Sequence, residues 1–274
     1  MDPSDELRVA HRAALEAGEI ASERASEDLR AAAGTESKTN ANDLVTAVDH
    51  ACQDRIVATI KDRFPDDRIV AEENDVNQTL DQGREWVVDP IDGTSNFATG
   101  FPYFCVSVAF RVDGEPRAGV VHSPDPALGR TWYAAAGDGA YLSTDDTLDG
   151  DPISVSDHET MHGATVFGRL SERERSRRAT DTVVALAILE NGAKLRRLGA
   201  TALNLSLIAE GCADGYIVLS TNDWDLAAGE LILREAGGSV RVRNGPDGRE
   251  LVATNGRLQS DLEGIVRYAA GRSE

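Results

Sequence analysis

The order of helix and strand signals along the chain constrains its fold more than any other feature. Two segments with helical spacing of apolar residues come first, at residues 4–33 and 47–63, with a polar loop at 35–43 between them. Short apolar runs typical of strands follow at 69–71, 86–88, 105–110, 117–121, 132–136 and 164–167. Helices and strands then alternate, with helices at 172–190, 201–210 and 226–236, strands at 195–198 and 216–219, and a final strand, strand and helix. This order predicts a layered α/β (α+β) fold.

The domain organisation follows from what the sequence does not contain. No internal repeat, low-complexity tract or linker divides residues 1–274, so we expect a single domain. Residues 145–151 form the loosest stretch, and we place any subdomain seam there.

The charge balance is strongly acidic. The chain carries 28 lysines and arginines against 47 aspartates and glutamates, a formal net charge of −19. Such a surface repels nucleic acid and anionic membranes, so we expect neither as a partner. Only Lys38, Lys61 and Lys194 are lysines, and this shortage indicates a halophilic protein. The three scattered cysteines, the lack of a long apolar run and the absence of a signal-peptide pattern indicate a cytoplasmic location.

The densest chemical signal is the segment 86–97, Trp-Val-Val-Asp-Pro-Ile-Asp-Gly-Thr-Ser-Asn-Phe. An apolar strand runs directly into two carboxylates, Asp89 at the strand end and Asp92 in the turn, which can converge on one point. Gly93 lets the backbone approach a ligand closely, and a short helix beginning at Thr94 would offer its first amides to a phosphate. A bare pair of aspartates three apart is more often an ordinary turn, so further ligands are needed to favour a metal site.

Three other acidic elements provide such ligands. Glu72 and Glu73 end a strand, Asp225 lies at the expected N-cap of the 226–236 helix, and Asp49 ends a short apolar stretch. Each is unremarkable alone. Together with Asp89 and Asp92 they form an oxygen-only donor set without His or Cys, which suits Mg²⁺ better than zinc.

These blocks resemble the inositol monophosphatase family of lithium-sensitive, magnesium-dependent phosphatases. The resemblance covers most of the chain in order, and its third and last blocks together are highly specific. The matching blocks are Lys38 with 43–49, Glu72–Glu73, 89–96, the substrate-side loop 197–204, and 224–229 with 235–238.

The resemblance implies a layered αβαβα fold, a homodimer and a role for each residue. Glu72, Asp89 and the Ile91 carbonyl would hold one Mg²⁺, and Asp89, Asp92 and Asp225 a second, with a weaker third near Glu72. Thr94 and Asp49 would polarise the attacking water. The remaining expected site residues are the phosphate-binding amides of Gly93 and Thr94, the substrate-side residues Gly199, Ala200 and Thr201, and the supporting Lys38.

The chemistry expected from this resemblance is that of a phosphoric monoester hydrolase. Two or three Mg²⁺ ions would activate water to hydrolyse a small sugar or polyol phosphate of the inositol-1-phosphate type. Fructose-1,6-bisphosphatase activity, alone or in addition, is the main alternative, and 3′-phosphoadenosine 5′-phosphate is a less favoured substrate. A catalytically silent protein that binds metal or phosphate is the alternative from another class. The D-x-D-x-T motif of haloacid-dehalogenase phosphatases is absent, because Asp89 and Asp92 are three residues apart.

One position departs from the family pattern. Family members that act on inositol carry a glutamate seven residues before the metal-binding aspartate of the last block, whereas this chain has Val218. A valine cannot accept a hydroxyl hydrogen bond, so the pattern predicts broad specificity. Arg196 and Arg197 are the expected partners of a second phosphate, because the planar guanidinium suits bidentate binding.

Overall fold

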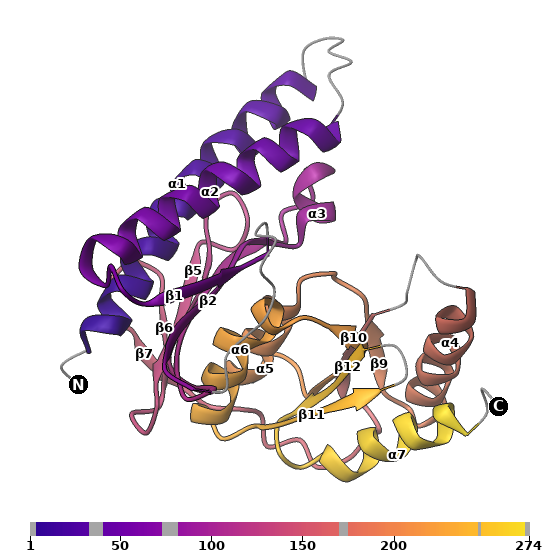
Figure 1. Cartoon of the computed structure of the whole chain (residues 1–274). Helices are drawn as coiled ribbons and strands as arrows, with labels where there is room; N and C mark the ends of the chain where they lie inside the picture. Colours follow the sequence, from indigo (N-terminus) through magenta and orange to yellow (C-terminus); the bar gives the residue numbers. More distant parts are fainter. Residues whose placement is uncertain (1–3, 33–40, 73–81, 170–174, 246–247, 272–274) are drawn as a thin grey trace.

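The computed structural model describes residues 4–32, 41–72, 82–169, 175–245 and 248–271, arranged as helices packed against two sheets (Figure 1). The helices are α1 Asp5–Ala32, α2 Ala41–Arg63, α3 Thr94–Ala98, α4 Arg175–Glu190, α5 Thr201–Ala209, α6 Asp223–Glu235 and α7 Gln259–Ala270. The strands are β1 Arg68–Ala71, β2 Arg84–Asp92, β3 Cys105–Val112, β4 Glu115–Ser123, β5 Arg130–Ala135, β6 Ala140–Ser143, β7 Asp151–Ile153, β8 Thr165–Gly168, β9 Lys194–Arg196, β10 Gly215–Thr221, β11 Ser239–Gly245 and β12 Gly248–Thr254.

The strands form two sheets that follow each other in the sequence. The first has seven strands in the order β1 to β7, with β1 parallel to β2 and every other neighbouring pair antiparallel. The second has five strands in the order β11-β12-β10-β8-β9, in which β8 is parallel to both β10 and β9. The chain passes from one sheet to the other between Ile153 and Thr165.

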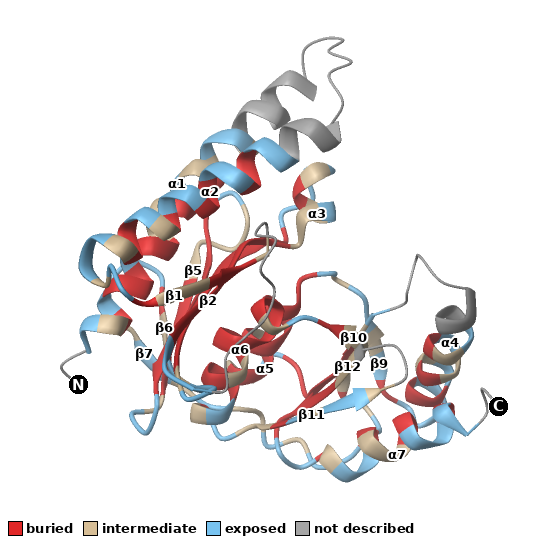
Figure 2. Cartoon of the chain, viewed as in Figure 1, coloured by how far each residue is buried: buried red, intermediate tan, exposed pale blue. Residues whose placement is uncertain are grey.

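Five layers result, and the expected αβαβα fold is confirmed. Helices α1 and α2 cover one face of the seven-stranded sheet, α5 and α6 lie between the two sheets, and α4 and α7 cover the outer face of the second sheet (Figure 1). Alternation along β2 shows how the sequence produces this. Trp86 and Val88 point into the core beneath α1 and α2, whereas Val87 points into the core shared with α5 and α6. Buried residues accordingly fill the central strands and helices (Figure 2).

Most elements lie where the sequence placed them, with corrections at α2, at β6 and β7, at α6 and, within the site, at Asp92. The second helix begins at Ala41, not at residue 47, so residues 41–43, the end of the expected polar loop, belong to a helix. Polar and acidic residues are common in a first helical turn, where amides lack partners. The short strands β6 and β7 were not predicted, because three or four residues carry too little periodicity. Residues 145–151 join these two strands of one sheet, and the single-domain organisation stays a prediction.

The third correction concerns the start of α6. This helix begins at Asp223 with Asn222 as its N-cap, so Asp225 is the third helical residue and not the cap. The Asp225 carboxylate instead accepts the Asn222 amide at 3.4 Å and the Thr221 hydroxyl at 3.2 Å. Several residues of this run are good caps, and extended backbone at Asn222 selects that one. None of the described helices is long and apolar enough to cross a bilayer.

A buried histidine pair lies where α1 packs on the first sheet. His122 of β4 is 5% exposed and shares a 2.8 Å hydrogen bond between Nδ1 and the Thr131 hydroxyl. Its ring fills the space where Gly18 of α1 has no side chain, so this helix can approach the sheet closely. Burial, with repulsion from His11, lowers the pKa of His122 to about 4. Burial also lowers the pKa of His11, against the attraction of Asp146.

The histidine pair predicts a loss of stability in mild acid. A folded-state pKa near 4, below the unfolded value of about 6.5, means that the unfolded chain binds the proton more readily. Above pH ~6.5 the uncharged His122 therefore adds its full contribution to the free energy of unfolding, up to about 3 kcal/mol. This contribution is lost as the pH falls toward 4. His122→Gln keeps a hydrogen-bonding group but cannot be charged. Its free energy of unfolding should decline less over this range than that of the wild type or of the exposed control His162→Gln. Parallel curves for all three proteins would contradict the prediction.

Candidate active site

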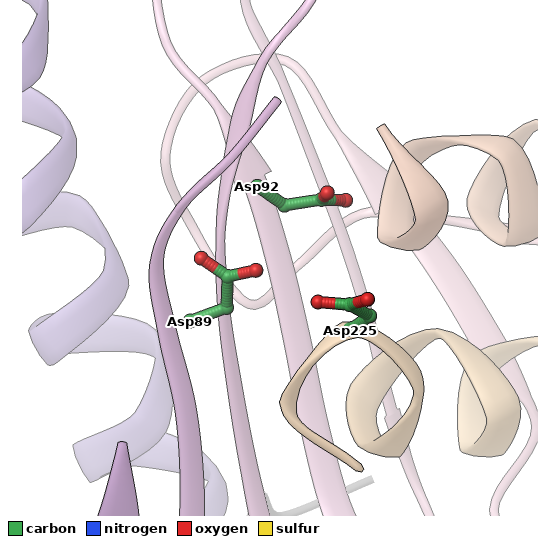
Figure 3. A group of neighbouring side chains, drawn as sticks. All are labelled: Asp89, Asp92 and Asp225. Carbon is green, nitrogen blue, oxygen red and sulfur yellow. The ribbon is translucent and has the colours of Figure 1, made fainter. Parts of the chain in front are cut away.

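Three buried carboxylates converge at the centre of the molecule. Asp89 and Asp92 come from β2 and Asp225 from the first turn of α6, and Figure 3 shows their side chains pointing toward one another. One oxygen of each lies within 4.8 Å of the others. Their residues are only 1%, 6% and 8% exposed. Carboxylates are rarely buried together without a cation, so this geometry is that of a candidate metal centre.

Local backbone irregularity turns both aspartates of β2 toward the same point. The strand continues through Asp92, which corrects its expected place in a turn, and its pairing with β3 shifts register between Asp89 and Asp92. Pro90 is tolerated at such an irregularity, where a ladder donor is not needed. The Asp89 carboxylate accepts the Ile91 amide at 3.0 Å, which fixes this side chain within the irregular stretch.

The segment after Asp92 folds as the sequence predicts. Gly93 has φ 97°, a left-handed conformation, and a Cβ there would lie 2.9 Å from the Tyr103 carbonyl oxygen. Helix α3 begins at Thr94, whose hydroxyl donates to the Ile91 carbonyl at 3.0 Å. The side chain of Asn96 donates to the carbonyls of Tyr103 at 2.8 Å and of Leu198 at 2.7 Å. The start of α3 is therefore attached directly to the loop that precedes α5.

Asp92 also accepts hydrogen bonds from the N-terminus of α5. Its Oδ2 accepts the Ala202 amide at 2.6 Å and is approached by the Cys105 thiol at 3.8 Å. The Thr201 amide also donates to it. Amides of a first helical turn lack partners within their own helix and favour an anion. The position of α5, and of the loop before it, thus depends on a residue of the candidate metal centre.

Charge repulsion dominates the electrostatics of this group. Burial, followed by repulsion from Glu72, Asp92, Asp225 and Asp49, raises the pKa of Asp89 well above its usual range. Burial and repulsion from Asp225 raise the pKa of Asp92 to about 8, against the amide bonds that lower it. Burial raises the pKa of Asp225 as well. Near neutral pH the group therefore retains protons, and a divalent cation must displace them on binding.

The donor set fits Mg²⁺. It consists of hard carboxylate oxygens, with the Ile91 carbonyl close by in the same irregular stretch, and it gathers more negative charge than neighbouring groups balance. Glu72, directly after β1, is half-buried, and Asp49 of α2 is 3% exposed. Both are near enough to Asp89 for their charges to repel it, so the structure brings five of the six predicted carboxylates into one region.

The remaining expected residues fall into three groups. Gly199 is exposed with φ 90°, at the end of the loop that Asn96 holds. Ala200 and Thr201 are buried, and the Thr201 hydroxyl pairs with that of Tyr216 at 3.1 Å. Lys38 and Glu73 lie outside the described residues.

Sequence reasoning gave no role to three neighbours of this site. Asn96 contacts Leu198 and Cys105 contacts Asp92. Local sequence patterns do not predict such contacts between separate segments. The third is Arg169, whose attraction lowers the pKa of Asp225 against the larger effect of burial.

The comparisons with known proteins agree with this geometry. The sequence matches the inositol monophosphatase family over residues 2–270. The chain belongs to this family. It is therefore a phosphatase, a phosphoric monoester hydrolase, and enzymes of its family generally depend on magnesium.

Its relatives and structural neighbours cover nearly the whole chain. The chain is 33% identical over 263 residues to Nus factor SuhB of Pasteurella multocida, covering 95% of this chain and 92% of that protein. It is 34% identical over 244 residues to fructose-1,6-bisphosphatase/inositol-1-monophosphatase of Thermotoga maritima, covering 84% of this chain and 85% of that one. The inositol monophosphatase structure from Anabaena (Nostoc) sp. PCC 7120 superimposes with a TM-score of 0.78 at 29% identity, over 96% of this chain and 95% of that one.

The repulsion within the centre predicts how this inositol monophosphatase family member responds to Mg²⁺. Mg²⁺ should raise the melting temperature of the wild type, because a ligand of the native state at 100 times its Kd stabilises by about 2.7 kcal/mol. Asp225→Asn removes one of the repelling charges. Without Mg²⁺ the variant should be at least as stable as the wild type, and its Mg²⁺-dependent rise should be much smaller. The exposed control Asp66→Asn should keep the full rise, and an undiminished rise in Asp225→Asn would remove Asp225 from the centre.

Proposed function

We propose that this chain hydrolyses the phosphate monoester of a small sugar or polyol with Mg²⁺ as its cofactor. The observation that carries the proposal is the convergence of Asp89, Asp92 and Asp225 in a buried group. Membership in a family of magnesium-dependent phosphatases supports it. A phosphate monoester is among the slowest substrates to hydrolyse in water, so its hydrolysis requires strong compensation of negative charge.

Two Mg²⁺ ions, with a weaker third near Glu72, are the proposed complement of the site. Glu72, Asp89 and the Ile91 carbonyl would hold one, and Asp89, Asp92 and Asp225 the other. When bound, the ions would neutralise the phosphate and lower the pKa of a coordinated water. The Ile91 carbonyl already accepts the Thr94 hydroxyl, so one carbonyl links a proposed ligand set to the residue proposed for proton transfer.

Thr94 and Asp49 are proposed to orient and deprotonate the attacking water. The Thr94 hydroxyl has a single proton to donate, so while taking a proton from the water it would turn, on the proposed path, from the Ile91 carbonyl to Asp49, the final acceptor. Its residue is 3% exposed, so bulk water competes little for that carboxylate. The charge of Asp49 reaches Asp89, which places this proposed base beside the metal ligands.

The phosphate and the rest of the substrate would meet two backbone segments. The amides of Gly93 and Thr94 open the first turn of α3 and are proposed to bind the phosphate. Gly199 is exposed, whereas Ala200 and Thr201 are buried. In the proposed substrate loop, Gly199 would therefore contact the substrate through its backbone, and Thr201 would hold the loop on Asp92 and Tyr216.

The candidate substrates can be ranked. Inositol-1-phosphate is the first candidate, and the Thermotoga maritima relative, named for both activities, favours fructose-1,6-bisphosphate as a second. Val218 is 1% exposed and packs in the core between the sheets, so it offers no acceptor to a hydroxyl. We therefore propose broad specificity. We give 3′-phosphoadenosine 5′-phosphate a lower rank, and the catalytically silent alternative a lower one still.

Partners and location stay predictions. A homodimer and a cytoplasmic location are expected from the family resemblance and the composition. Several relatives are named Nus factor SuhB, a name that describes those proteins. For this chain a net charge of −19 disfavours direct binding to nucleic acid.

Phosphate release across three substrates tests the proposal. With Mg²⁺ in high KCl, we expect release from inositol-1-phosphate and fructose-1,6-bisphosphate, little from 3′-phosphoadenosine 5′-phosphate, and none from any in EDTA. No Mg²⁺-dependent release from any of the three, by protein that still binds Mg²⁺, would favour the silent alternative.

The proposed proton transfer separates two variants of Thr94. Thr94→Ala removes the hydroxyl and should lower kcat by about 10²–10⁴-fold, the usual range for general-base assistance. Thr94→Ser keeps the hydroxyl and its bond to the Ile91 carbonyl, so it should retain most of the activity. Both kcat and the Mg²⁺ concentration for half-maximal activity are measured. If Thr94→Ala weakens Mg²⁺ binding as much as it lowers kcat, the residue supports the turn and transfers no proton.

A further inference from the structure

Arg169 lies at the edge of the second sheet that faces the candidate metal centre. It follows β8 directly, and its amide donates to the Ile217 carbonyl of β10 at 3.4 Å. The two strands are parallel, so their carboxyl ends meet at one edge of the sheet. Helix α6, which carries Asp225, begins immediately after β10. Arg169 and Asp225 therefore emerge from the same edge.

The guanidinium of Arg169 is available to a ligand. The residue is exposed and makes no ion pair with any other residue in the described part of the chain. Burial raises the pKa of Asp225 and that of Tyr216, and the charge of Arg169 opposes both increases, so it lies within electrostatic reach of both groups. A cation this close to the centre that forms no ion pair with a protein carboxylate can pair with an anionic group of the substrate.

A pocket adjoins this arginine. Its empty volume is about 320 Å³, part of it open to solvent, between α4 and the strands β8, β9 and β10. Arg169 and Arg197 are its exposed members, so they form its mouth, whereas Ile188, Val184 and Ile217 are buried within it. The one carboxylate that lines it, Asp181, is buried and already engaged by neighbours, as Arg197 is.

We propose that Arg169 binds the non-scissile phosphate of a sugar bisphosphate and so favours this substrate class over polyol monophosphates, which carry no second phosphate. The inference rests on the proposed function. A second phosphate placed beyond the centre would meet the one guanidinium near Asp225 that the described residues leave unpaired, with geometry suited to bidentate binding. An uncharged polyol offers it no anion.

This assignment replaces the two arginines that the sequence suggested. Arg196 donates to the Leu195 carbonyl at 3.1 Å and does not line the pocket. Arg197 lines it but already has its own partners. Arg169 is among the strongest charge effects on Asp225, whereas neither Arg196 nor Arg197 is among the strongest effects on any of the three carboxylates.

The test compares fructose-1,6-bisphosphate with inositol-1-phosphate in four proteins: the wild type, Arg169→Gln, Arg169→Lys and the control Arg117→Gln. Arg117 is an exposed arginine of β4, and its replacement changes the net charge equally. In Arg169→Gln we expect kcat/KM for the bisphosphate to fall about tenfold to hundredfold, mainly through KM, because the contact is with a group that does not react. The monophosphate should change less than about threefold, Arg169→Lys should recover part of the loss, and Arg117→Gln should match the wild type.

The outcomes distinguish this inference from the function on which it rests. The rise in melting temperature with Mg²⁺ is measured for each variant and should be unchanged in Arg169→Gln. Hydrolysis of neither substrate by the wild type would contradict the proposed function. Hydrolysis of the monophosphate alone, or of both substrates with equal losses in Arg169→Gln, would overturn the role of Arg169 and leave that function standing.

Discussion

Repulsion between buried carboxylates is the constraint on which the rest of this structure depends. The fold brings oxygens of Asp89, Asp92 and Asp225 within 4.8 Å and leaves each residue at most 8% exposed. Water screens little in such a place, so the repulsion is strong, and only protons or a cation can relieve it. The raised pKa values of the three groups express the same fact. A core built only for stability would gain from apolar side chains here, which is why the group indicates function.

The constraint reaches other layers through Asp92. Its carboxylate accepts amides at the start of α5, and Asn96, four residues later, holds the loop that leads into that helix. A change in the charge on this one side chain therefore alters what holds α5 against the first sheet. Asp225 plays the corresponding part at α6, where it bonds the Asn222 amide. In both helices of the middle layer, backbone amides at the N-terminus thus bond to an aspartate of the candidate centre. The layered arrangement and the site therefore depend on each other.

Local patterns predicted the elements well and their long-range contacts poorly. The apolar periodicity of 86–88 predicted β2, and Asp89 with Asp92 followed as ligands because carboxylates after a buried strand converge. The register shift that aims them was not predictable, since it depends on pairing with β3. The cap of α6 was misplaced because Asn222 and Asp225 are both good caps, and the extended backbone at Asn222 decides between them. The partner of Asn96 lies 102 residues away, at Leu198, and no periodicity reports such a contact.

The residues proposed for catalysis and those proposed for substrate recognition come mainly from different sheets. The residues proposed for the chemistry come mainly from the first sheet and its neighbours, with Asp89 and Asp92 on β2 and Asp49 on α2. The residues that would meet the rest of the substrate come from elements of the second sheet, with Arg169 after β8 and Gly199 in the loop after β9. Helix α6 belongs to both parts, since it follows β10 and carries Asp225 to the centre. The scissile phosphate is common to all candidate substrates, so every one of them requires the same residues for the chemistry. The residues for substrate recognition can then vary with the substrate without disturbing the chemistry, so a shared family identifies the reaction more firmly than it identifies what is hydrolysed.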